Sequence, residues 1–367
     1  MAQSLNTPLQ LASCRVTELR LSVVIVAWNS VATLRTTLPP LVEQLRDGDE
    51  LIVADNGSDD GTPELVARLA PSAQLVEMGA NTGFAAAAAA GAEVASGELL
   101  LLLNPDARPL PGFRKAIVRP WIEDRGWAAW MGLVACNGAR EVNTAGNPVH
   151  FTGLAWAGEH GKPLRDIERR EVTALSGACM ALPLETFRRL GGFPAPYFLY
   201  HEDIDLSMRL RLQGERLGLE PSAVVDHDYE FEGATKMRWL ERNRWAFVLR
   251  VYPGALLALL APALLLTEIA LIPISIAGGW GGQKLLADLD GLRRLPWALR
   301  TRRAIQRRRT VSAADFAALL TPDLDSPYFG RAGRSRVLRF ALRTYWRFVR
   351  SLLGPTSAGE SGEPTPR

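Results

Sequence analysis

The feature that most constrains the fold of this sequence is a regular alternation of short apolar runs with segments of helical length, beginning at Leu21. In order, the chain reads "LSVVIVAWN", 31–46, "ELIVADNGS", 63–70, "AQLVEM", 83–96 and "ELLLLLNPD". Buried strands joined by helices are typical of parallel sheets with crossover helices on both faces. The alternation therefore predicts an α/β fold around a mostly parallel sheet.

Polar residues follow three of the four predicted strands, as "WNS", "DNGSDDGT" and "NPD". In open α/β sheets, ligands bind outside the carboxyl ends of the strands. Asp55 ends the second strand, where it can accept hydrogen bonds from a nucleobase or ribose, or simply form a turn. Asp106 follows the fourth strand, where a carboxylate suits Mg²⁺ or Mn²⁺, or caps a turn. We therefore expect the ligand site at this edge of the sheet.

The segment "GANTGFAAAAAAGAEVASG" is rich in small residues but lacks the GxGxxG spacing of dinucleotide-binding proteins. An oxidoreductase is accordingly a poor interpretation. The alanines predict a helix packed closely against the sheet, with Asn81 and Gly83 shaping its start.

The stretch "HEDIDLSMRLR" places three acids at the expected start of a helix. The helix dipole favours an ionised carboxylate there, and such a group can act as a general base toward an acceptor hydroxyl. The residues alone favour the alternative, a capping cluster with Arg209 or Arg211 as solvated partners.

Composition limits the class of protein. The 367 residues are 47% hydrophobic and 22% charged with a net charge of +3, which indicates a globular chain and gives no case for a nucleic-acid partner. Cys14, Cys136 and Cys179 show no CxxC spacing, which favours buried thiols in a reducing compartment. The first 20 residues do not read as a secretory signal, so we expect a cytoplasmic location.

The apolar segment 256–279 is long enough for a membrane span, but Pro262, Glu268 and Pro273 divide it into two pieces. Arginines flank it on both sides, from Arg242 to Arg250 before it and from Arg293 to Arg309 after it. Because positive residues mark the cytoplasmic side, a re-entrant hairpin or a pair of interfacial helices fits best. The alternative is a buried helical pair packed on the catalytic domain.

The segment "RVLRFALRTYWRFVRSLL" repeats arginine at spacings of three and four residues. This predicts a basic amphipathic helix lying on an anionic membrane surface, or else a surface helix with a solvated charged face. The residues after it are rich in Gly, Pro, Ser and Glu and are expected to be disordered.

Taken in order, seven segments resemble family 2 glycosyltransferases, particularly rhamnosyltransferase-like members: "SVVIVAWNS", "LIVADNGSDDGT", "NTGFA", "LLLLNPDARPLPG", "SGACMALPLETFRRLGGF", "YFLYHEDIDLSMRLRLQG" and "VVDHDYEF". The resemblance implies the GT-A fold, with a mixed, mostly parallel sheet, plus C-terminal membrane-associated helices. The expected organisation is an extension (1–20), a GT-A domain (21–252), apolar helices with a basic flank (253–310), a basic amphipathic region (311–353) and a disordered tail (354–367).

The resemblance also implies roles for individual residues. Asp203 is similar to the catalytic base of inverting members, with Glu202 as the second candidate. Asp106 and His227 correspond to metal ligands for Mg²⁺ or Mn²⁺, and Asn104 replaces the first acid of the DxD motif. The remaining site residues are expected on the nucleotide-sugar side, at Ala27, Asn29, Asp55, Asn81, Gly83, Asn104 and Asp106, and on the acceptor side, at Ser176 and Gly177.

The resulting expectation is an inverting, metal-assisted glycosyltransferase at the cytoplasmic face of the cell membrane. It would move a sugar such as rhamnose from a nucleotide-diphosphate donor to a lipid-linked or cell-wall polysaccharide acceptor. The alternatives are a sugar-nucleotide nucleotidyltransferase, whose Gly-rich pyrophosphate loop is missing from "VVIVAWNSVATL", and a non-catalytic scaffold of the same fold.

Overall fold

The computed structural model describes residues 19–228, 234–325 and 335–357. The chain divides into two compact units. The first is Met1–Gly146, Glu159–Glu202 and Arg216–Tyr229, and the second is Asn147–Gly158, Asp203–Glu215 and Glu230–Arg367. The domain boundaries expected from the sequence stay predictions, and most of the expected extension and tail lies outside the described residues.

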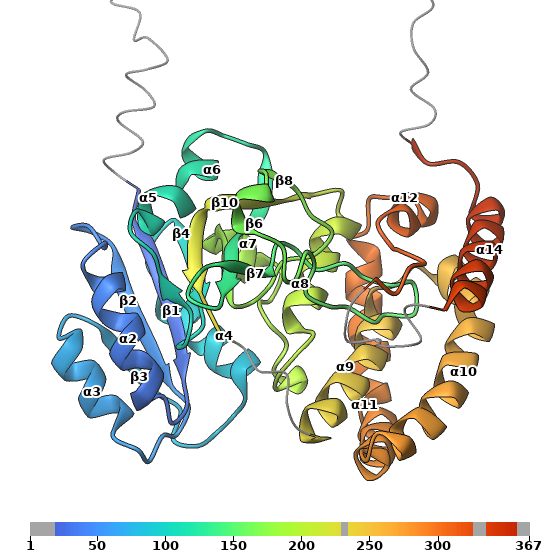
Figure 1. Cartoon of the computed structure of the whole chain (residues 1–367), viewed down its shortest axis with the longest axis horizontal. Helices are drawn as coiled ribbons and strands as arrows, with labels where there is room; N and C mark the ends of the chain where they lie inside the picture. Colours follow the sequence, from blue (N-terminus) through green and yellow to red (C-terminus); the bar gives the residue numbers. More distant parts are fainter. Residues whose placement is uncertain (1–18, 229–233, 326–334, 358–367) are drawn as a thin grey trace, which may run out of the picture. The chain divides into compact units, whose positions relative to one another are not determined.

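Within the described residues, the first unit is built on a ten-stranded sheet whose main path runs β3-β2-β1-β4-β9-β6-β10-β5 (Figure 1). The strands pair in parallel across β3, β2, β1 and β4, as the four apolar runs predict. Strand β9 then pairs antiparallel with β4 and β6, so the sheet is mixed. The strands are β1 (Leu21–Ala27), β2 (Glu50–Asp55), β3 (Gln74–Glu77), β4 (Leu99–Leu103), β5 (Arg108–Pro109), β6 (Trp127–Cys136), β7 (Glu141–Thr144), β8 (Arg170–Glu171), β9 (Cys179–Pro183) and β10 (Arg216–Asp226).

The crossover helices of this unit are largely those expected, although α2 ends at Val42 instead of residue 46. The alanine-rich α4 packs directly on β1, since a Cβ atom on Gly91 would lie 2.5 Å from Cγ1 of Val24. The close packing predicted for this segment is therefore confirmed. The helices are α2 (Val31–Val42), α3 (Thr62–Leu69), α4 (Phe84–Val94), α5 (Phe113–Ile117), α6 (Arg119–Ile122) and α7 (Leu184–Arg189), with 3₁₀ turns at Leu164–Asp166 and Ala195–Tyr197.

The core of the first unit lies around the central strands, and every residue of β1 and β4 is buried. Cys136 and Cys179 are free and buried, as expected from their spacing. Burial raises the pKa of the Cys179 thiol to about 12, so this thiol is inert at neutral pH. Cys14 lies outside the described residues.

The second unit is helical in its described part (Figure 1). Its helices are α9 (Ala234–Val251), α10 (Gly254–Ala277), α11 (Gly281–Arg307), α12 (Ala313–Ala318) and α14 (Arg336–Leu353), and the boundary between the units falls inside α8 (Glu202–Leu212). A turn at Gly278 and Gly279 reverses the chain between α10 and α11.

The expected division of the apolar segment into two pieces was wrong, because α10 is one continuous helix that contains Pro262 and Pro273. A proline in a helix removes one hydrogen bond and bends the helix, and the remaining backbone bonds carry the helix past it. Among the described helices, α10 is long and apolar enough to cross a membrane, with 17% of its most apolar stretch buried.

The arginines before α10, which the sequence analysis counted as a positive flank of the apolar segment, lie inside the protein. Arg242, Arg244 and Arg250 are all buried within the second unit. Arg244 pairs with Glu241 and with Glu268 of α10, so its charge is neutralised inside the protein. These three residues therefore cannot be counted as juxtamembrane charges.

Candidate active site

The carboxyl ends of β1 and β2 meet where Ala27 and Asp55 face each other in parallel register. The backbone of Asn56 donates to the carbonyl of Ala27 at 2.7 Å, and the backbone of Asn29 donates to Oγ of Ser58 at 2.9 Å. Asp55 is buried; its Oδ2 accepts from the Ser58 backbone, whereas its Oδ1 has no hydrogen-bond partner among the described residues. A buried carboxylate oxygen in this state is a ready acceptor for a ligand hydroxyl or N–H.

A second loop is fastened to this edge by Asn56, a residue that the sequence analysis missed. Its side chain accepts from the backbone of Thr82 at 2.8 Å and donates to Oδ1 of Asn81 at 3.1 Å. Asn81 in turn accepts from the backbone of Gly83. Gly83 has a φ of 87°, and a Cβ there would lie 2.4 Å from the ring of Phe198, so only glycine fits.

Asp106 and His227 converge although they come from different strands. Oδ1 of Asp106, in the loop after β4, lies 3.0 Å from Nε2 of His227, which follows β10. The amide nitrogen of the Asn104 side chain lies 3.5 Å from the same ring nitrogen. The structure thus brings together the two residues that the resemblance assigns to the metal and the asparagine that replaces the first acid of the DxD motif.

These residues fit a divalent cation that takes most of its ligands from a substrate. Oδ1 of Asp106 is buried, and apart from its 3.0 Å approach to Nε2 of His227 it accepts no hydrogen bond from the described residues, which suits it to a cation. Among the described residues, no group of three or more His, Cys, Asp or Glu could hold a metal. Mg²⁺ commonly binds through one or two carboxylates together with waters and substrate phosphates, so a sparse set of this kind is adequate.

The position of His227 is fixed through its backbone. Its N–H donates to the carbonyl of Ala135 at 2.8 Å, and its carbonyl accepts from the side chain of Asn143 at 3.0 Å. The preceding Asp226 is paired with Arg108 at 2.7 Å. The position of the imidazole therefore depends on contacts with distant strands and not on the residues next to His227 in the sequence.

The residues expected on the acceptor side precede β9. Gly177 is buried and Ser176 half-buried, and the Ser176 hydroxyl accepts from the backbone of Ala178 at 3.4 Å. The carbonyl of Ala178 accepts from the backbone of Asn104 at 3.0 Å. This segment therefore lies beside the loop that carries Asp106.

A run of left-handed residues precedes the two candidate catalytic acids. Phe198, Tyr200 and His201 have φ values of 64°, 69° and 67°. Such conformations are unfavourable for residues other than glycine and gather at functional sites. The backbone leading into Glu202 is therefore held in a strained shape.

Glu202 is buried and ends the segment Glu159–Glu202 of the first unit. Asp203 is half-buried and begins the part of α8 that belongs to the second unit. Oδ1 of Asp203 accepts from the backbone of Ile204 at 2.7 Å. This bond orients the carboxylate at the helix start, where the helix dipole favours its charged form.

Asp205 is an internal ion-pair residue and not a solvent-facing acid. Its two oxygens accept from Nε of Arg209 at 2.6 Å and from a guanidinium nitrogen of Arg250 at 2.5 Å, and all three side chains are buried. Trp297 covers Arg250, with 4.5 Å between the ring centroid and the guanidinium carbon. Asp205 thus ties α8 to α9.

The order of the strands in this mixed sheet is that of the GT-A fold of glycosyltransferases. GalNAc-T7, solved with UDP, GalNAc and Mn²⁺, matches at a TM-score of 0.53 and 18% identity over 66% of this chain and 50% of its own. S. aureus TarS 1–349, solved with UDP, matches at a TM-score of 0.51 and 15% identity over 90% of each chain.

Residues 22–191 match the model of glycosyl transferase family 2. These residues, a little under half of the chain, form a family 2 glycosyltransferase domain, and rhamnosyltransferases are among the proteins to which the chain is similar. It is 29% identical over 205 residues to the N-acetylglucosaminyl-diphospho-decaprenol L-rhamnosyltransferase of Mycobacterium tuberculosis, a match covering 48% of this chain and 66% of that protein, just under two thirds. It is 33% identical over 79 residues to rhamnosyltransferase WbbL of Escherichia coli, covering 20% of this chain and 30% of that protein.

Proposed function

We propose that the protein is an inverting glycosyltransferase that moves L-rhamnose from a nucleotide-diphosphate donor to a lipid-linked acceptor in cell-wall or polysaccharide synthesis. The observation that carries this proposal is the convergence of Asn104, Asp106 and His227 in a family 2 domain. The sugar and the lipid-linked acceptor are inferred from the similarity to the mycobacterial relative, an N-acetylglucosaminyl-diphospho-decaprenol L-rhamnosyltransferase.

On the donor side, Asp55 receives the nucleoside, since its Oδ1 is buried without a hydrogen-bond partner among the described residues. Ala27 and Asn29 line the same edge, while Asn81 and Gly83 shape the neighbouring loop. Asp106 and His227 would hold Mg²⁺ or Mn²⁺, which when bound neutralises the diphosphate leaving group.

On the acceptor side, Asp203 takes the proton of the acceptor hydroxyl while that oxygen attacks the anomeric carbon and the bond to the diphosphate breaks. Its place at the start of α8 favours the ionised form that this step requires. Glu202 is the second candidate for the base, and Ser176 and Gly177 are assigned to the acceptor.

We further propose that the protein is monotopic at the cytoplasmic face, with α10 lying along the membrane. Glu268, in the middle of α10, pairs with Arg244 of α9 and with Lys284 of α11. Burial opposes the charged form of Glu268, but the two cations lower its pKa. A membrane-crossing α10 would carry this charged network to bilayer depth at a high cost in free energy.

A donor screen tests the enzymatic proposal. Detergent-solubilised protein is given dTDP-, UDP- and GDP-sugars with Mg²⁺ or Mn²⁺ and a membrane lipid extract, and nucleoside diphosphate release is measured beside Asp203→Asn. We expect release to require one donor, a metal, the extract and Asp203. Release that is unchanged in Asp203→Asn would overturn the assignment of the base. Formation of a nucleotide sugar from a sugar phosphate and a nucleoside triphosphate would indicate the nucleotidyltransferase instead.

Membrane fractionation tests the location. We expect the protein to remain with membranes through a high-salt wash and to need detergent for release. Full recovery in the soluble fraction after the wash would remove the membrane from the proposal.

A further inference from the structure

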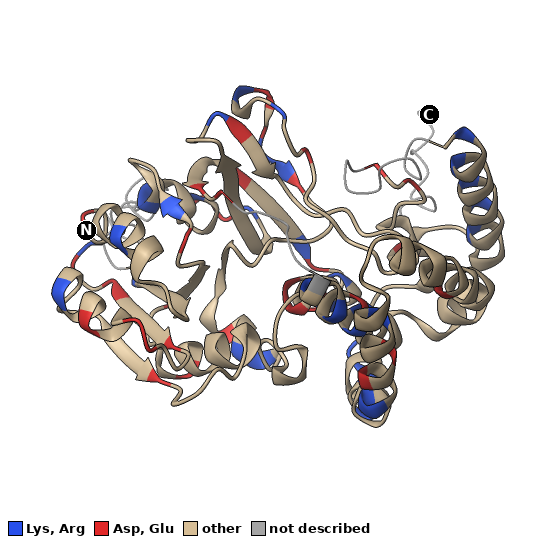
Figure 2. Ribbon diagram, turned by 60° about the horizontal axis from the view of Figure 1, so that its bottom comes forward, with Lys and Arg blue, Asp and Glu red and all other residues tan. Residues whose placement is uncertain are grey.

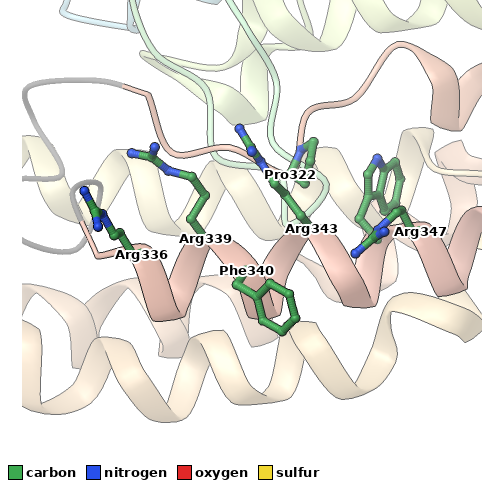
Figure 3. A pocket seen from close by; sticks show the side chains of 7 residues that line it. Pro322, Arg336, Arg339, Phe340, Arg343 and Arg347 are labelled. Carbon is green, nitrogen blue, oxygen red and sulfur yellow. The ribbon is translucent and has the colours of Figure 1, made fainter.

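The helix α14 carries an arginine-rich groove that the proposed reaction does not use. Its volume is about 530 Å³. Figure 3 shows the side chains that line it. Basic residues recur along α14 (Figure 2). The groove, named here the α14 groove, is lined by Pro322, Arg336, Arg339, Phe340, Arg343, Trp346 and Arg347.

The residues at the floor of the α14 groove are held in place by ring stacking and hydrogen bonds. The ring of Trp346 stacks on Phe151 with 5.0 Å between centroids, and the carbonyl of Pro322 lies 3.3 Å from Nε2 of His150. The backbone of Thr321 donates to the carbonyl of Val149. These contacts lie within the second unit, so the groove is a defined feature of its fold.

The charge of the α14 groove suits a phosphate. Guanidinium groups bind phosphate oxygens through paired hydrogen bonds, and Figure 3 shows Arg339 and Arg343 directed to the side on which Pro322 lies. Arg343 already donates to both oxygens of Asp323, at 2.7 and 3.0 Å. An arriving phosphate would therefore compete with Asp323 for Arg343.

The surroundings of the α14 groove favour a phosphate carried by a lipid over a soluble one. Val337, Phe340 and Phe348 of α14 are exposed at 81%, 69% and 58%. Tyr345 joins α14 to α10 through a 2.5 Å hydrogen bond to the carbonyl of Leu259. The exposed large apolar residues of α10 are Leu265, Leu266, Ile269, Ile272, Ile274 and Ile276. A soluble anion gains nothing from such a surface, whereas acyl chains do.

We propose that the α14 groove binds the phosphate headgroup of an anionic membrane phospholipid, and that Asp323 is an intramolecular competitor that occupies Arg343 until the headgroup displaces it. The inference rests on the membrane association proposed above. It adds a discrete headgroup site and a carboxylate that controls it.

Vesicle co-sedimentation of the full chain tests the site. Phosphatidylglycerol in phosphatidylcholine vesicles is compared with phosphatidylcholine alone, using the double variant Arg339→Gln, Arg347→Gln. We expect binding to the anionic vesicles to fall about thirtyfold, from the attraction that each arginine adds near an anionic surface. The matched control is Arg307→Gln, Arg309→Gln, which removes the same charge from exposed positions at the end of α11 and should change binding by less than about threefold. Equal losses in both double variants would overturn the site.

The competitor is tested by Asp323→Asn, which should strengthen binding to anionic vesicles by freeing Arg343. Asp325→Asn removes the same charge two residues away and separates this effect from a general change in net charge. A gain in Asp323→Asn alone supports the competitor, whereas equal gains in both variants, or no gain, overturn it.

Soluble sn-glycerol 1-phosphate distinguishes the source of the phosphate. We expect vesicle binding to survive millimolar amounts of it, and displacement of the protein by this compound would overturn the assignment to a lipid. The experiment measures vesicle binding and not sugar transfer. Its results can therefore be interpreted even if the proposed reaction is wrong. Persistent vesicle binding with no effect of the groove variants would discard the groove and keep the membrane association.

Discussion

Oδ1 of Asp106 lies 3.0 Å from Nε2 of His227, so the loop after β4 and the end of β10 meet at one point. Each group alone is a weak cation ligand, and in the proposed function the two together would hold a cation whose remaining ligands come from the substrate diphosphate. Loss of either group should therefore impair both the binding of the cation and the use of the donor.

His227→Ala should lower transfer about a hundredfold and raise the Mn²⁺ concentration needed for half-maximal rate, because one of two protein ligands is lost. Initial rates across a Mn²⁺ titration check this. The control is Asp228→Asn, whose carboxylate accepts from the backbone of Asn137. A similar loss in Asp228→Asn would mean that the segment matters only for folding.

Asp203→Asn and Asp205→Asn should separate catalysis from stability. The first keeps the oxygen that accepts from Ile204 and should reduce the rate about 10²–10⁴-fold with little change in unfolding. The second leaves Arg209 and Arg250 buried without their carboxylate and should cost about 3–5 kcal/mol. Rates and urea unfolding of both variants are the measurements, and a stable Asp205→Asn protein would contradict the ion-pair role.

Gly83→Ala should destabilise the protein by at least about 1 kcal/mol more than Gly79→Ala. Both glycines have positive φ, but a Cβ on Gly79 would meet nothing within 4 Å, whereas one on Gly83 would enter the ring of Phe198. The difference in unfolding free energy between the two variants isolates this clash. Equal costs would show that Phe198 moves aside freely.

The stability of the second unit should fall on acidification because of His150. Burial lowers the pKa of this histidine from 6.5 to about 4. The hydrogen bond with the carbonyl of Pro322 and the charge of Asp323 oppose this shift, and Arg244 adds a smaller lowering. The histidine of the unfolded chain takes up its proton at a higher pH than the buried histidine of the folded chain. The contribution of His150 to the free energy of unfolding is therefore fully present above about pH 6.5 and is lost as the pH falls toward 4. The loss is of order 3 kcal/mol over that range.

Urea unfolding at pH 7 and pH 5 measures this dependence. His150→Gln should flatten it, whereas His160→Gln, at an exposed position, should retain it. An unchanged slope in His150→Gln would assign the acid sensitivity to other groups.

The sequence predicts the parallel half of the sheet and two of the acids, since Asp55 and Asp106 directly follow apolar runs and strand ends are readable locally. His227 was found only through resemblance to the family, because the pairing of β10 beside β6 brings it to Asp106. Asn56 was missed because its partners lie in the loop 81–83. The one local signal was an asparagine between a strand-ending acid and Gly57, whose φ is 78°.

The helical unit could be predicted less well. Arg244 and Arg250 read as surface charges because their partners, Glu268 and Asp205, come from other helices. Pro262 and Glu268 read as breaks in the apolar segment because sequence alone does not reveal that neighbouring helices satisfy the charge. In each case the difference between prediction and structure comes from contacts between residues that are far apart in the sequence.

The contact between Gly83 and Phe198 has a consequence for engineering donor preference. The backbone of Ala85 also donates to the carbonyl of Phe198, at 3.1 Å. The start of α4 and the strained segment that leads to Glu202 are therefore held together, and a change in one will displace the other. A chimera that imports the 81–85 loop of another transferase must import its counterpart of residues 198–201 as well, or the exchange will disturb the acids along with the donor pocket.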